Sequence, residues 1–183
     1  MEIRLASGLQ PDSIVDGEGI RTVIWTQGCS HNCPGCHNPG THDFKGGFTV
    51  STAEVMNELA GLKGQQGITF SGGDPLFQPE ACLEIAKFAQ KQGLDVWCYT
   101  GFTFETLLKS EKCVQFLKYV DVLVDGPFII AEKSLNVDFR GSRNQRIIDV
   151  PASLARKQVV LIPKYVGERE VRVNIVKPKH IYV

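Results

Sequence analysis

The sequence predicts an α/β fold: an incomplete, open (β/α) barrel built on a mostly parallel sheet, in a chain of 183 residues. Four apolar strand candidates alternate with helical segments, which is the pattern of βαβ units. A polar or metal-binding group stands at the end of each candidate strand, and parallel α/β folds place their ligands at that edge. A complete eight-stranded barrel needs about 250 residues, so the barrel expected here is partial.

Composition favours one soluble domain without a bias toward nucleic acid. The chain carries 20 Lys and Arg against 20 Asp and Glu, a formal net charge of zero. No apolar run approaches the roughly 20 residues of a membrane span, and the first residues lack the build of a signal peptide. We therefore expect a cytoplasmic protein that binds neither membranes nor nucleic acids directly and keeps its cysteines reduced.

The first strand candidate covers residues 22–26, and Gly17 and Gly19 predict a turn that leads into it. Arg21 stands at its start. An arginine there is most often a solvated end, and a role in the site is the alternative.

Three cysteines follow this strand in a C-x3-C-x2-C pattern: Cys29, Cys33 and Cys36. Thiolates at this spacing can converge on one metal centre in a tight loop. A zinc site would need a fourth ligand, which a nearby histidine could supply. An iron–sulfur cluster held by three thiolates would leave one iron open to a substrate or cofactor.

The other cysteines, Cys82, Cys98 and Cys113, lie apart and are flanked by apolar or aromatic residues. Free cysteine is often buried as a small hydrophobic residue, so we expect all three in the core.

A capping box of Ser51 and Glu54 predicts the start of a helix whose apolar face includes Val55 and Leu59.

The second strand candidate, residues 68–70, ends in Ser-Gly-Gly-Asp-Pro over positions 71–75. Two glycines let backbone approach a ligand closely, and the carboxylate beside them can accept a hydrogen bond from an ammonium group.

Pro79 predicts the start of a second helix over residues 80–92. The third strand candidate, residues 96–100, ends at Thr100, and a helical region begins at residue 103. The fourth, residues 120–124, is followed by Asp125. Thr100 and Asp125 are therefore candidate ligand-binding residues.

Residues 138–150 are polar and predict a loop before a short strand.

Residues 151–183 hold seven Lys and Arg and two Glu, a net charge of +5, and alternate apolar with polar residues on both sides of a turn at 167–170. This pattern predicts a β-hairpin that closes the open edge of the barrel. Partner binding through a basic surface is the alternative. We expect a barrel domain over 1–150 with a basic tail, 151–183, packed on it.

Three motifs resemble those of the radical S-adenosylmethionine (SAM) enzymes. They are the cysteine loop, the Gly72-Gly73-Asp74 run, which is similar to the family's G-G-E, and residues 16–21, which are similar to D-G-P-G-x-R with Glu18 in place of proline. The resemblance implies a [4Fe-4S] cluster whose open iron binds SAM, inside a partial barrel. It assigns Cys29, Cys33 and Cys36 to the metal. It assigns Gly35, Cys36, His37, Gly72, Gly73 and Asp74 to SAM, joined by the strand-end residues Thr100 and Asp125.

Local features narrow the resemblance to the glycyl-radical activating enzymes of anaerobic ribonucleoside-triphosphate reductase. They are Cys33-Pro34-Gly35-Cys36, the run at 124–128 and the run at 140–145. The implied activity is reductive cleavage of SAM to a 5′-deoxyadenosyl radical that abstracts a glycine Cα hydrogen. The implied partners are the large catalytic subunit of the reductase and an electron donor such as flavodoxin or ferredoxin.

Two alternatives stay open at this point. The chain could activate another glycyl-radical enzyme, such as pyruvate formate-lyase, which identifying the converted glycine would reveal. It could instead be a zinc-binding interaction module without catalysis. Colour separates that class, because an iron–sulfur protein purified without oxygen is brown and a zinc protein is colourless.

Overall fold

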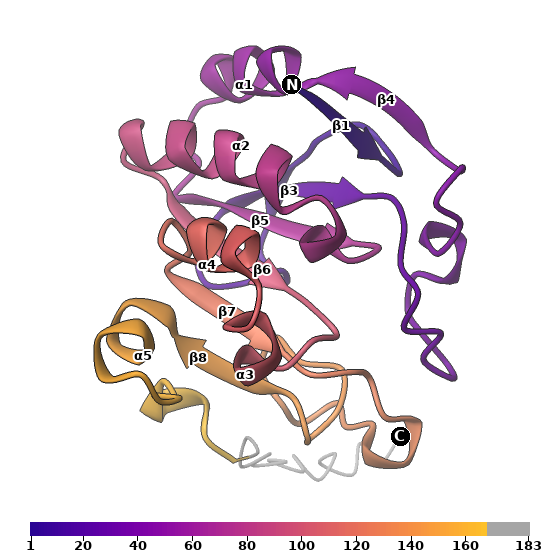
Figure 1. The fold of residues 1–183 in the computed structure, drawn as a ribbon, viewed down its shortest axis with the longest axis vertical. Coiled ribbons are helices and arrows are strands. Elements are labelled where there is room, and N and C mark those ends of the chain that lie inside the picture. Colours follow the sequence, from indigo (N-terminus) through magenta and orange to yellow (C-terminus); the bar gives the residue numbers. More distant parts are fainter. Residues whose placement is uncertain (168–183) are drawn as a thin grey trace, which may run out of the picture.

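The computed structural model describes residues 1–167 and contains one sheet of eight strands in that range. The strand order is β4-β1-β3-β5-β6-β7-β8, with β2 beside β3 (Figure 1). The strands are β1 Glu2–Leu5, β2 Gln10–Ser13, β3 Arg21–Thr26, β4 Phe48–Ser51, β5 Gly67–Gly72, β6 Asp95–Tyr99, β7 Val122–Asp125 and β8 Arg146–Asp149. The α-helices are α1 Thr52–Gly61, α2 Pro79–Lys91, α3 Phe104–Leu107, α4 Glu111–Leu117 and α5 Val150–Arg156.

The centre of the sheet is parallel, as the sequence predicts. Strands β3, β5, β6 and β7 pair in parallel one after another, whereas β1, β2, β4 and β8 join antiparallel at the two sides. Helices α1, α2 and α4 follow one another along one side of the sheet (Figure 1). The chain is therefore an α/β protein with an open, partial barrel, and the carboxyl ends of its parallel strands share one edge.

The helices begin where the sequence places their signals. Ser51 caps α1 and completes the capping box with Glu54, so two amides of the first turn have side-chain partners. Pro79 opens α2. The helical region expected from residue 103 divides into α3 and α4, because Ser110 interrupts it with a new N-cap.

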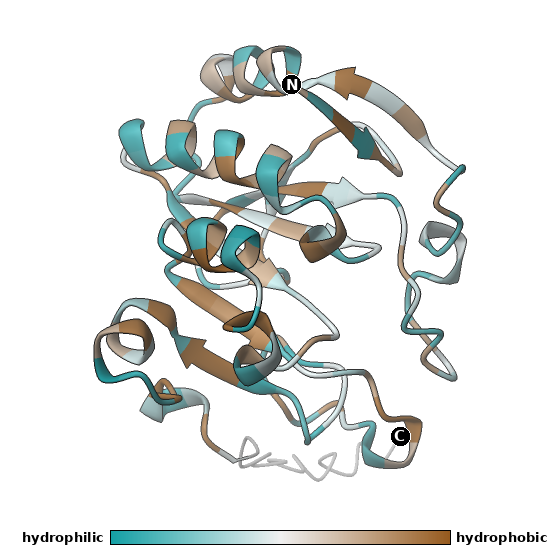
Figure 2. Cartoon of the chain, in the orientation of Figure 1, coloured by the Kyte–Doolittle hydropathy of each residue, from teal (hydrophilic) through white to brown (hydrophobic). Residues whose placement is uncertain are grey.

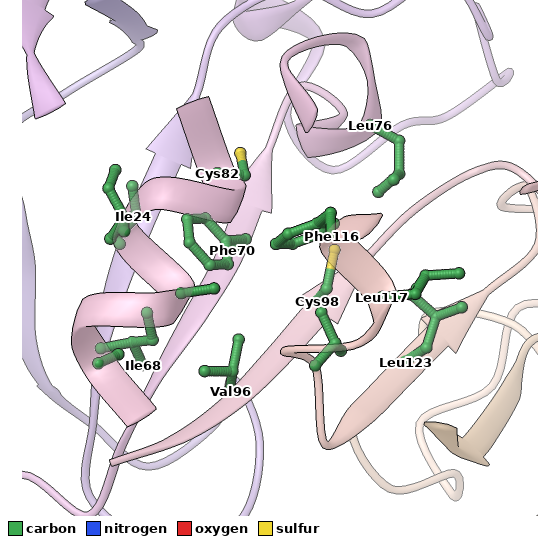
Figure 3. Close-up of a cluster of buried hydrophobic side chains, with 14 of the residues drawn as sticks. Ile24, Ile68, Phe70, Leu76, Cys82, Val96, Cys98, Phe116, Leu117 and Leu123 are labelled. Atoms are coloured by element: carbon green, nitrogen blue, oxygen red, sulfur yellow. The ribbon is translucent and has the colours of Figure 1, made fainter. Parts of the chain in front are cut away.

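The core lies between this helical layer and the sheet. It joins the apolar faces of β3, β5, β6 and β7 to α2 and α4, and Phe70 meets Phe116 edge to face with 5.5 Å between ring centroids (Figure 3). Figure 2 shows mostly apolar residues along β7 and β8 and polar ones on the outward turns of α2 and α4. Cys82, Cys98 and Cys113 are buried here, which confirms their predicted role as core residues.

Three antiparallel strands were not expected from the sequence. Strand β1 buries only Ile3 and Leu5, β2 buries one of its four residues and β4 buries none. Strands this short carry too few alternating apolar residues to indicate a buried face. Their pairing partners, which come from distant positions in the chain, determine their conformation.

The tail predicted over residues 151–183 begins with a helix that the sequence analysis did not predict. Residues 150–156 form α5, whose start is capped by Asp149, and the side chain of that residue accepts a hydrogen bond from the Ala152 amide at 2.9 Å. Leu161 then makes an isolated antiparallel bridge with Ile148 of β8. Residues 159–162 therefore pair with the free edge of β8, as expected of a segment that closes this side of the sheet. The expected turn beyond residue 167 and the second arm lie outside the described residues.

Arg21 corrects the expectation of a solvated strand end. Its side chain is fully buried at the amino edge of the sheet, opposite the carboxyl edge. The guanidinium donates to the hydroxyl of Thr69 at 2.8 Å, pairs with Asp95 and lies over the Trp97 ring. Its role is to hold the amino ends of β3, β5 and β6 together, away from the site.

Candidate functional site

A cavity of about 420 Å³ opens at the carboxyl ends of the parallel strands. Small-molecule sites typically measure about 300–1,000 Å³. All four parallel strands supply residues to its wall from their carboxyl ends or the loops that follow, and residues 15–16 and 139–145 contribute as well. The predicted site residues that line it are Cys29, Cys33, Cys36, His37, Gly72, Gly73 and Thr100.

Local turns bring the three cysteines to this cavity. Asn32 and Gly35 both have positive φ angles, 48° and 75°, so the chain reverses between successive cysteines. The amide of Cys36 donates to the carbonyl of Cys33 at 3.1 Å and closes the second turn. Only three and then two residues separate successive cysteines, so the segments between them are short.

Gly35 supports the cysteine loop without lining the cavity. A Cβ at this position would lie 2.8 Å from Cδ1 of Ile130, and the positive φ adds strain for any other residue. Gly35 thus has a role in loop geometry, and its predicted contact with a cofactor stays a prediction.

The Cys29 thiol lies in a partly buried, electronegative environment. Burial raises the pKa of Cys29, and the charges of Asp74, Cys33 and Cys36 raise it further, while a hydrogen bond from the His31 amide acts in the opposite direction. The amide of Asn38 also donates to the Cys36 sulfur at 3.4 Å. Because metal ligation requires the thiolate, a bound metal would overcome the raised pKa by replacing the proton.

The donor set fits an iron–sulfur cluster with one open iron. Three partly buried thiols line one cavity, and the rest of the wall leaves room for a cofactor beside them. In such clusters each thiolate binds a different iron, so the sulfurs need not surround one point. Within residues 1–167 no three His, Cys, Asp or Glu side chains are arranged to hold a single metal ion.

The two glycines after β5 place the second motif directly against the cysteine strand. A Cβ on Gly72 would lie 2.6 Å from the Thr26 carbonyl oxygen, and one on Gly73 would lie 2.5 Å from that of Gly28. The amide of Gly73 donates to Thr26 at 2.7 Å, and that of Asp74 donates to Gly28 at 2.9 Å. Glycine is required because backbone meets backbone here. The two motifs therefore form one rigid wall.

Asp74 lies behind this wall, which corrects the expectation that its carboxylate faces SAM. The side chain is 1% exposed and does not line the cavity. Its Oδ1 accepts from the Leu76 amide at 2.9 Å, and its Oδ2 accepts from the Gly101 amide at 2.9 Å. The Thr100 hydroxyl lies within 3.0 Å of both oxygens, and Nε2 of His31 lies 2.7 Å from Oδ2. The carboxylate is thus surrounded by donors from this chain.

Asp125 is also buried away from the cavity, which corrects its predicted ligand role. Its Oδ1 accepts from Nε of Arg146 at 2.9 Å, and its Oδ2 accepts from the Phe104 amide at 2.7 Å. Arg146 also pairs with the exposed carboxylate of Glu105. Asp125 therefore joins β7 to β8 and to the first turn of α3. The sequence alone shows that a carboxylate stands at the end of a strand, but it does not show in which direction the side chain points.

The site also includes residues that the sequence analysis did not assign. Asp16, Trp25 and Tyr99 line the cavity, as do Arg140 and Gln145. Asp16 belongs to the motif at 16–21 and Arg140 and Gln145 to the run at 140–145, but the sequence analysis gave none of the five a role in the site, and they meet only in the fold. The two motifs that contain Asp16, Arg140 and Gln145 were available signals, as was the polar composition of the 138–150 loop, because polar loops often carry binding residues.

Arg140 connects this cavity to the C-terminal segment. Its Nη2 donates to the carbonyls of Tyr165 and Gly167, at 2.8 and 2.9 Å. Burial lowers the pKa of Arg140. His37 also lines the cavity, and its ring packs against Phe128 at 4.8 Å between centroids.

Among the described residues, the structure contains no helix with the length and apolar character needed to cross a membrane.

Comparison with known proteins finds a matching family and several relatives that share one description. Residues 15–148 match the family described as a 4Fe-4S single cluster domain. The chain is 34% identical over 145 residues to an anaerobic ribonucleoside-triphosphate reductase-activating protein of Haemophilus influenzae, covering 75% of this chain and 92% of that protein. It is 37% identical over 151 residues to the protein of that name from Enterobacteria phage T4, covering 76% and 90%. For the protein of that name from Escherichia coli K12 the identity is 35% over 144 residues, covering 74% and 92%.

Among solved structures, QueE from Escherichia coli is similar with a TM-score of 0.48 and 16% sequence identity. The superposition covers 56% of this chain and 54% of that one.

Proposed function

This chain belongs to the family of anaerobic ribonucleoside-triphosphate reductase-activating proteins, and we propose that its cavity is the site at which it activates such a reductase. It is a radical SAM enzyme that uses a [4Fe-4S] cluster and SAM. When bound, the cluster supplies the electron that cleaves SAM to methionine and a 5′-deoxyadenosyl radical, which removes a Cα hydrogen from a glycine of the reductase.

One observation carries the assignment of the site. The three cysteines of the C-x3-C-x2-C loop and both glycines of the Gly72-Gly73-Asp74 run line one cavity, at the carboxyl edge of the parallel strands. This edge is where α/β folds of this type bind their ligands. The cavity volume is also suited to a cofactor of the size of SAM.

Each residue then receives a distinct role. Cys29, Cys33 and Cys36 ligate three irons. The backbone of Gly72 and Gly73, both of which line the cavity, is assigned to the methionine end of SAM. His37 and Thr100 also line the cavity and are assigned to the same cofactor. Asp74 stabilises that wall from behind through its hydrogen bonds to the protein.

The electron comes from outside the chain in this proposal. The three other cysteines are buried in the core, so the described residues offer no second thiolate cluster as a relay. A flavodoxin or ferredoxin is the class of donor that fits a low-potential cluster. The proposed organisation is the one that the sequence suggests, with a barrel domain over 1–150 and a basic tail over 151–183, of which residues 151–167 are described.

The test is anaerobic reconstitution of the protein with iron and sulfide, followed by incubation with SAM and a reductant. The expected results are a brown protein, 5′-deoxyadenosine as a product, and a glycyl radical in the EPR spectrum when an anaerobic ribonucleoside-triphosphate reductase is added. Pyruvate formate-lyase serves as the competing partner. A radical formed only on that enzyme would contradict the assigned partner, and a colourless zinc-loaded protein without SAM cleavage would contradict the whole proposal.

A further inference from the structure

A second depression adjoins the cavity on the side of the C-terminal segment. It has a volume of about 200 Å³ and is lined by residues from 140–147 and from 161–167. Arg140 and Gln145 line both this depression and the cavity, so the two share part of their walls. We call it the arginine groove, after the side chains of Arg140, Arg143 and Arg146 that line it.

The arginine groove combines positive charge with exposed apolar surface. None of the described residues that line it is acidic. Arg143 is exposed, whereas Arg146 already pairs with two carboxylates outside the groove. Val166 is 63% exposed and Leu161 is 39% exposed, so apolar atoms also face the solvent here. A partner that fits this lining carries negative charge together with some apolar surface.

The charge of the chain is divided unevenly between this region and the rest. Residues 138–167 hold six Lys and Arg against two Asp, a net charge of +4. Residues 1–137 hold ten Lys and Arg against sixteen Asp and Glu, a net charge of −6. Charge of one sign gathered on one region speeds the association of an oppositely charged partner. The neutral chain therefore has a positive region, and the groove belongs to it.

The wall of the groove packs against the cysteine loop. The side chain of Gln145 accepts from the Gly141 amide at 2.8 Å and donates to the Gly126 carbonyl at 3.1 Å, which fixes this wall to the end of β7. A Cβ on Gly141 would lie 2.7 Å from Cε1 of His37, the residue directly after Cys36. Neighbouring residues in van der Waals contact therefore connect the groove to one of the predicted cluster ligands.

An electron carrier is the partner that suits this position. The proposed function requires an electron from outside the chain, and it also requires a glycine of the reductase to reach the cavity. A carrier docked over the cavity would compete with the reductase, whereas a carrier in the adjoining groove leaves the cavity accessible. Electron-transfer partners form small and weak interfaces, so a groove of this size is a sufficient anchor.

We propose that the arginine groove is the docking surface for the electron donor, a small electron carrier whose surface is acidic around its redox centre. Arg143 supplies the exposed charge that attracts the carrier, and Val166 contacts its apolar atoms. One electron leaves the reduced carrier and arrives at the oxidised cluster, and no bond forms or breaks. The inference rests on the proposed function, because it assigns a surface to the donor that this function requires.

The experiment measures how fast a reduced, acidic flavodoxin reduces the cluster of the reconstituted full-length protein, from the EPR signal of rapidly frozen samples. Arg143→Gln removes a charge from the groove, Arg143→Glu reverses it, and Val166→Glu adds a negative charge at a second position. Arg156→Gln is the matched control, because Arg156 is exposed and lies outside the groove, and its loss changes the net charge equally.

Two further measurements separate docking from the later steps. Excess dithionite replaces flavodoxin in a parallel series of SAM cleavage assays, because a small reductant needs no protein docking surface. Binding of oxidised flavodoxin to each cluster-free variant gives the affinity without any contribution from the cluster or from SAM.

At low salt we expect the second-order rate constant with flavodoxin to fall about threefold in Arg143→Gln and about tenfold in Arg143→Glu and Val166→Glu. The dissociation constant of flavodoxin should rise by similar factors. Arg156→Gln should match the wild type, and the differences should shrink as salt screens the charges. SAM cleavage with dithionite should be the same in all of these proteins.

Wild-type rates and affinities with flavodoxin in the groove variants that fold, as judged by melting temperature, would overturn the inference alone. Where Arg143→Glu does not fold, Arg143→Gln and Val166→Glu decide. Normal reduction by flavodoxin with less glycyl radical under dithionite would place the reductase in the groove, and faster reduction in a chain ending at residue 167 would place the C-terminal residues there. Either result contradicts the inference. A wild-type chain that takes up no cluster, or cleaves no SAM with dithionite, would overturn the proposed function.

Discussion

The hydroxyl of Tyr165 donates a hydrogen bond to the carboxylate of Glu18, 2.9 Å away. Glu18 stands where the similar family motif has proline, and it also pairs with Lys164. The Tyr165 ring packs against Trp97 and Phe139, and Phe139 lines the cavity. The C-terminal segment thus contacts both the N-terminal loop and the cavity wall.

We predict that a chain ending at residue 157 is less stable than the full chain, while the folded fraction still takes up its cluster. The truncation removes the Tyr165 contacts and exposes the edge of β8, where the Ile162 amide donates to Ile147. Loss of a buried aromatic residue costs about 3–5 kcal/mol, or on the order of 10 °C in melting temperature for a chain of this size. Thermal unfolding by circular dichroism measures the change.

A chain ending at residue 167 is the control for that truncation, because it keeps every contact named above. Partner binding by the tail makes a different prediction: unchanged melting temperature with weaker, salt-sensitive activation of the reductase. A chain ending at residue 157 that matched the full chain in both stability and activation would contradict both readings of the segment.

The second prediction separates the two groups of cysteines. Cys29→Ala, Cys33→Ala and Cys36→Ala should each abolish the four-iron cluster and SAM cleavage, since a methyl group cannot ligate iron. Cys82→Ala and Cys98→Ala should keep both, with a loss of about 1–2 kcal/mol in packing. Iron content and the visible absorption spectrum check the outcome. Loss of the cluster in Cys98→Ala alone would show that the ligand set is wrong.

The third prediction concerns Asp74→Asn, which keeps the shape and replaces one acceptor oxygen by a donor. Because the carboxylate faces the donors of Leu76, Gly101 and Thr100, the new amide leaves buried groups without a partner. We expect a loss of about 1–3 kcal/mol in the free energy of unfolding. Weaker SAM binding should accompany this loss, because the wall is less well held.

Urea unfolding and SAM titration distinguish this structural role from direct contact. A carboxylate that bound the ammonium of SAM would give about a ten- to hundredfold loss of SAM affinity with unchanged stability, since hydrogen bonds to charged groups contribute roughly 1.5–3 kcal/mol. That result would place Asp74 inside the cavity.

The fourth prediction is a pH dependence at the ion pair of Glu105 and Arg146. The hydrogen bond from Arg146 is the main cause that lowers the pKa of Glu105 to about 2. A depressed folded-state pKa contributes stability above the unfolded value, about 4.3, and this contribution is lost as the pH falls from there toward 2. The side chain is 58% exposed, so solvent limits the effect to less than about 1 kcal/mol.

The comparison is between the wild type and Glu105→Gln, both as cluster-free protein. Their unfolding free energies should differ above about pH 4 and converge near pH 2, and added salt should reduce the difference. A difference that is constant across this range would show that the pair contributes nothing through charge.

The parallel centre of the fold could be predicted because its strands, such as the one that ends at Thr26, are apolar runs bounded by glycine or proline. Short antiparallel strands such as β1 and β4 were missed because their conformation depends on partners far along the chain. Helix α5 was missed although Asp149 and Pro151 are ordinary start signals. The alternation of apolar and polar residues after this helix predicted a hairpin instead.

The site likewise contains residues that could be predicted from the sequence and residues that could not. The three thiols were identified because metal ligands in one loop leave a spacing that can be read directly. Asp74 and Asp125 were correctly placed at strand ends, yet their side chains turn inward to donors of the protein. Arg140 and Asp16 were not assigned, because only the folded chain brings the segments that carry them to one cavity.

The burial of three cysteines in the core has a consequence for how the protein acquires its iron. Burial raises the pKa of Cys82 and of Cys98, so both remain protonated and out of reach of the solvent. Iron and sulfide that enter the apo-protein therefore meet only the three thiols of the cavity. The fold thus separates the cysteines that can bind iron from those that cannot. A cluster could form on the buried cysteines only if the core first opened.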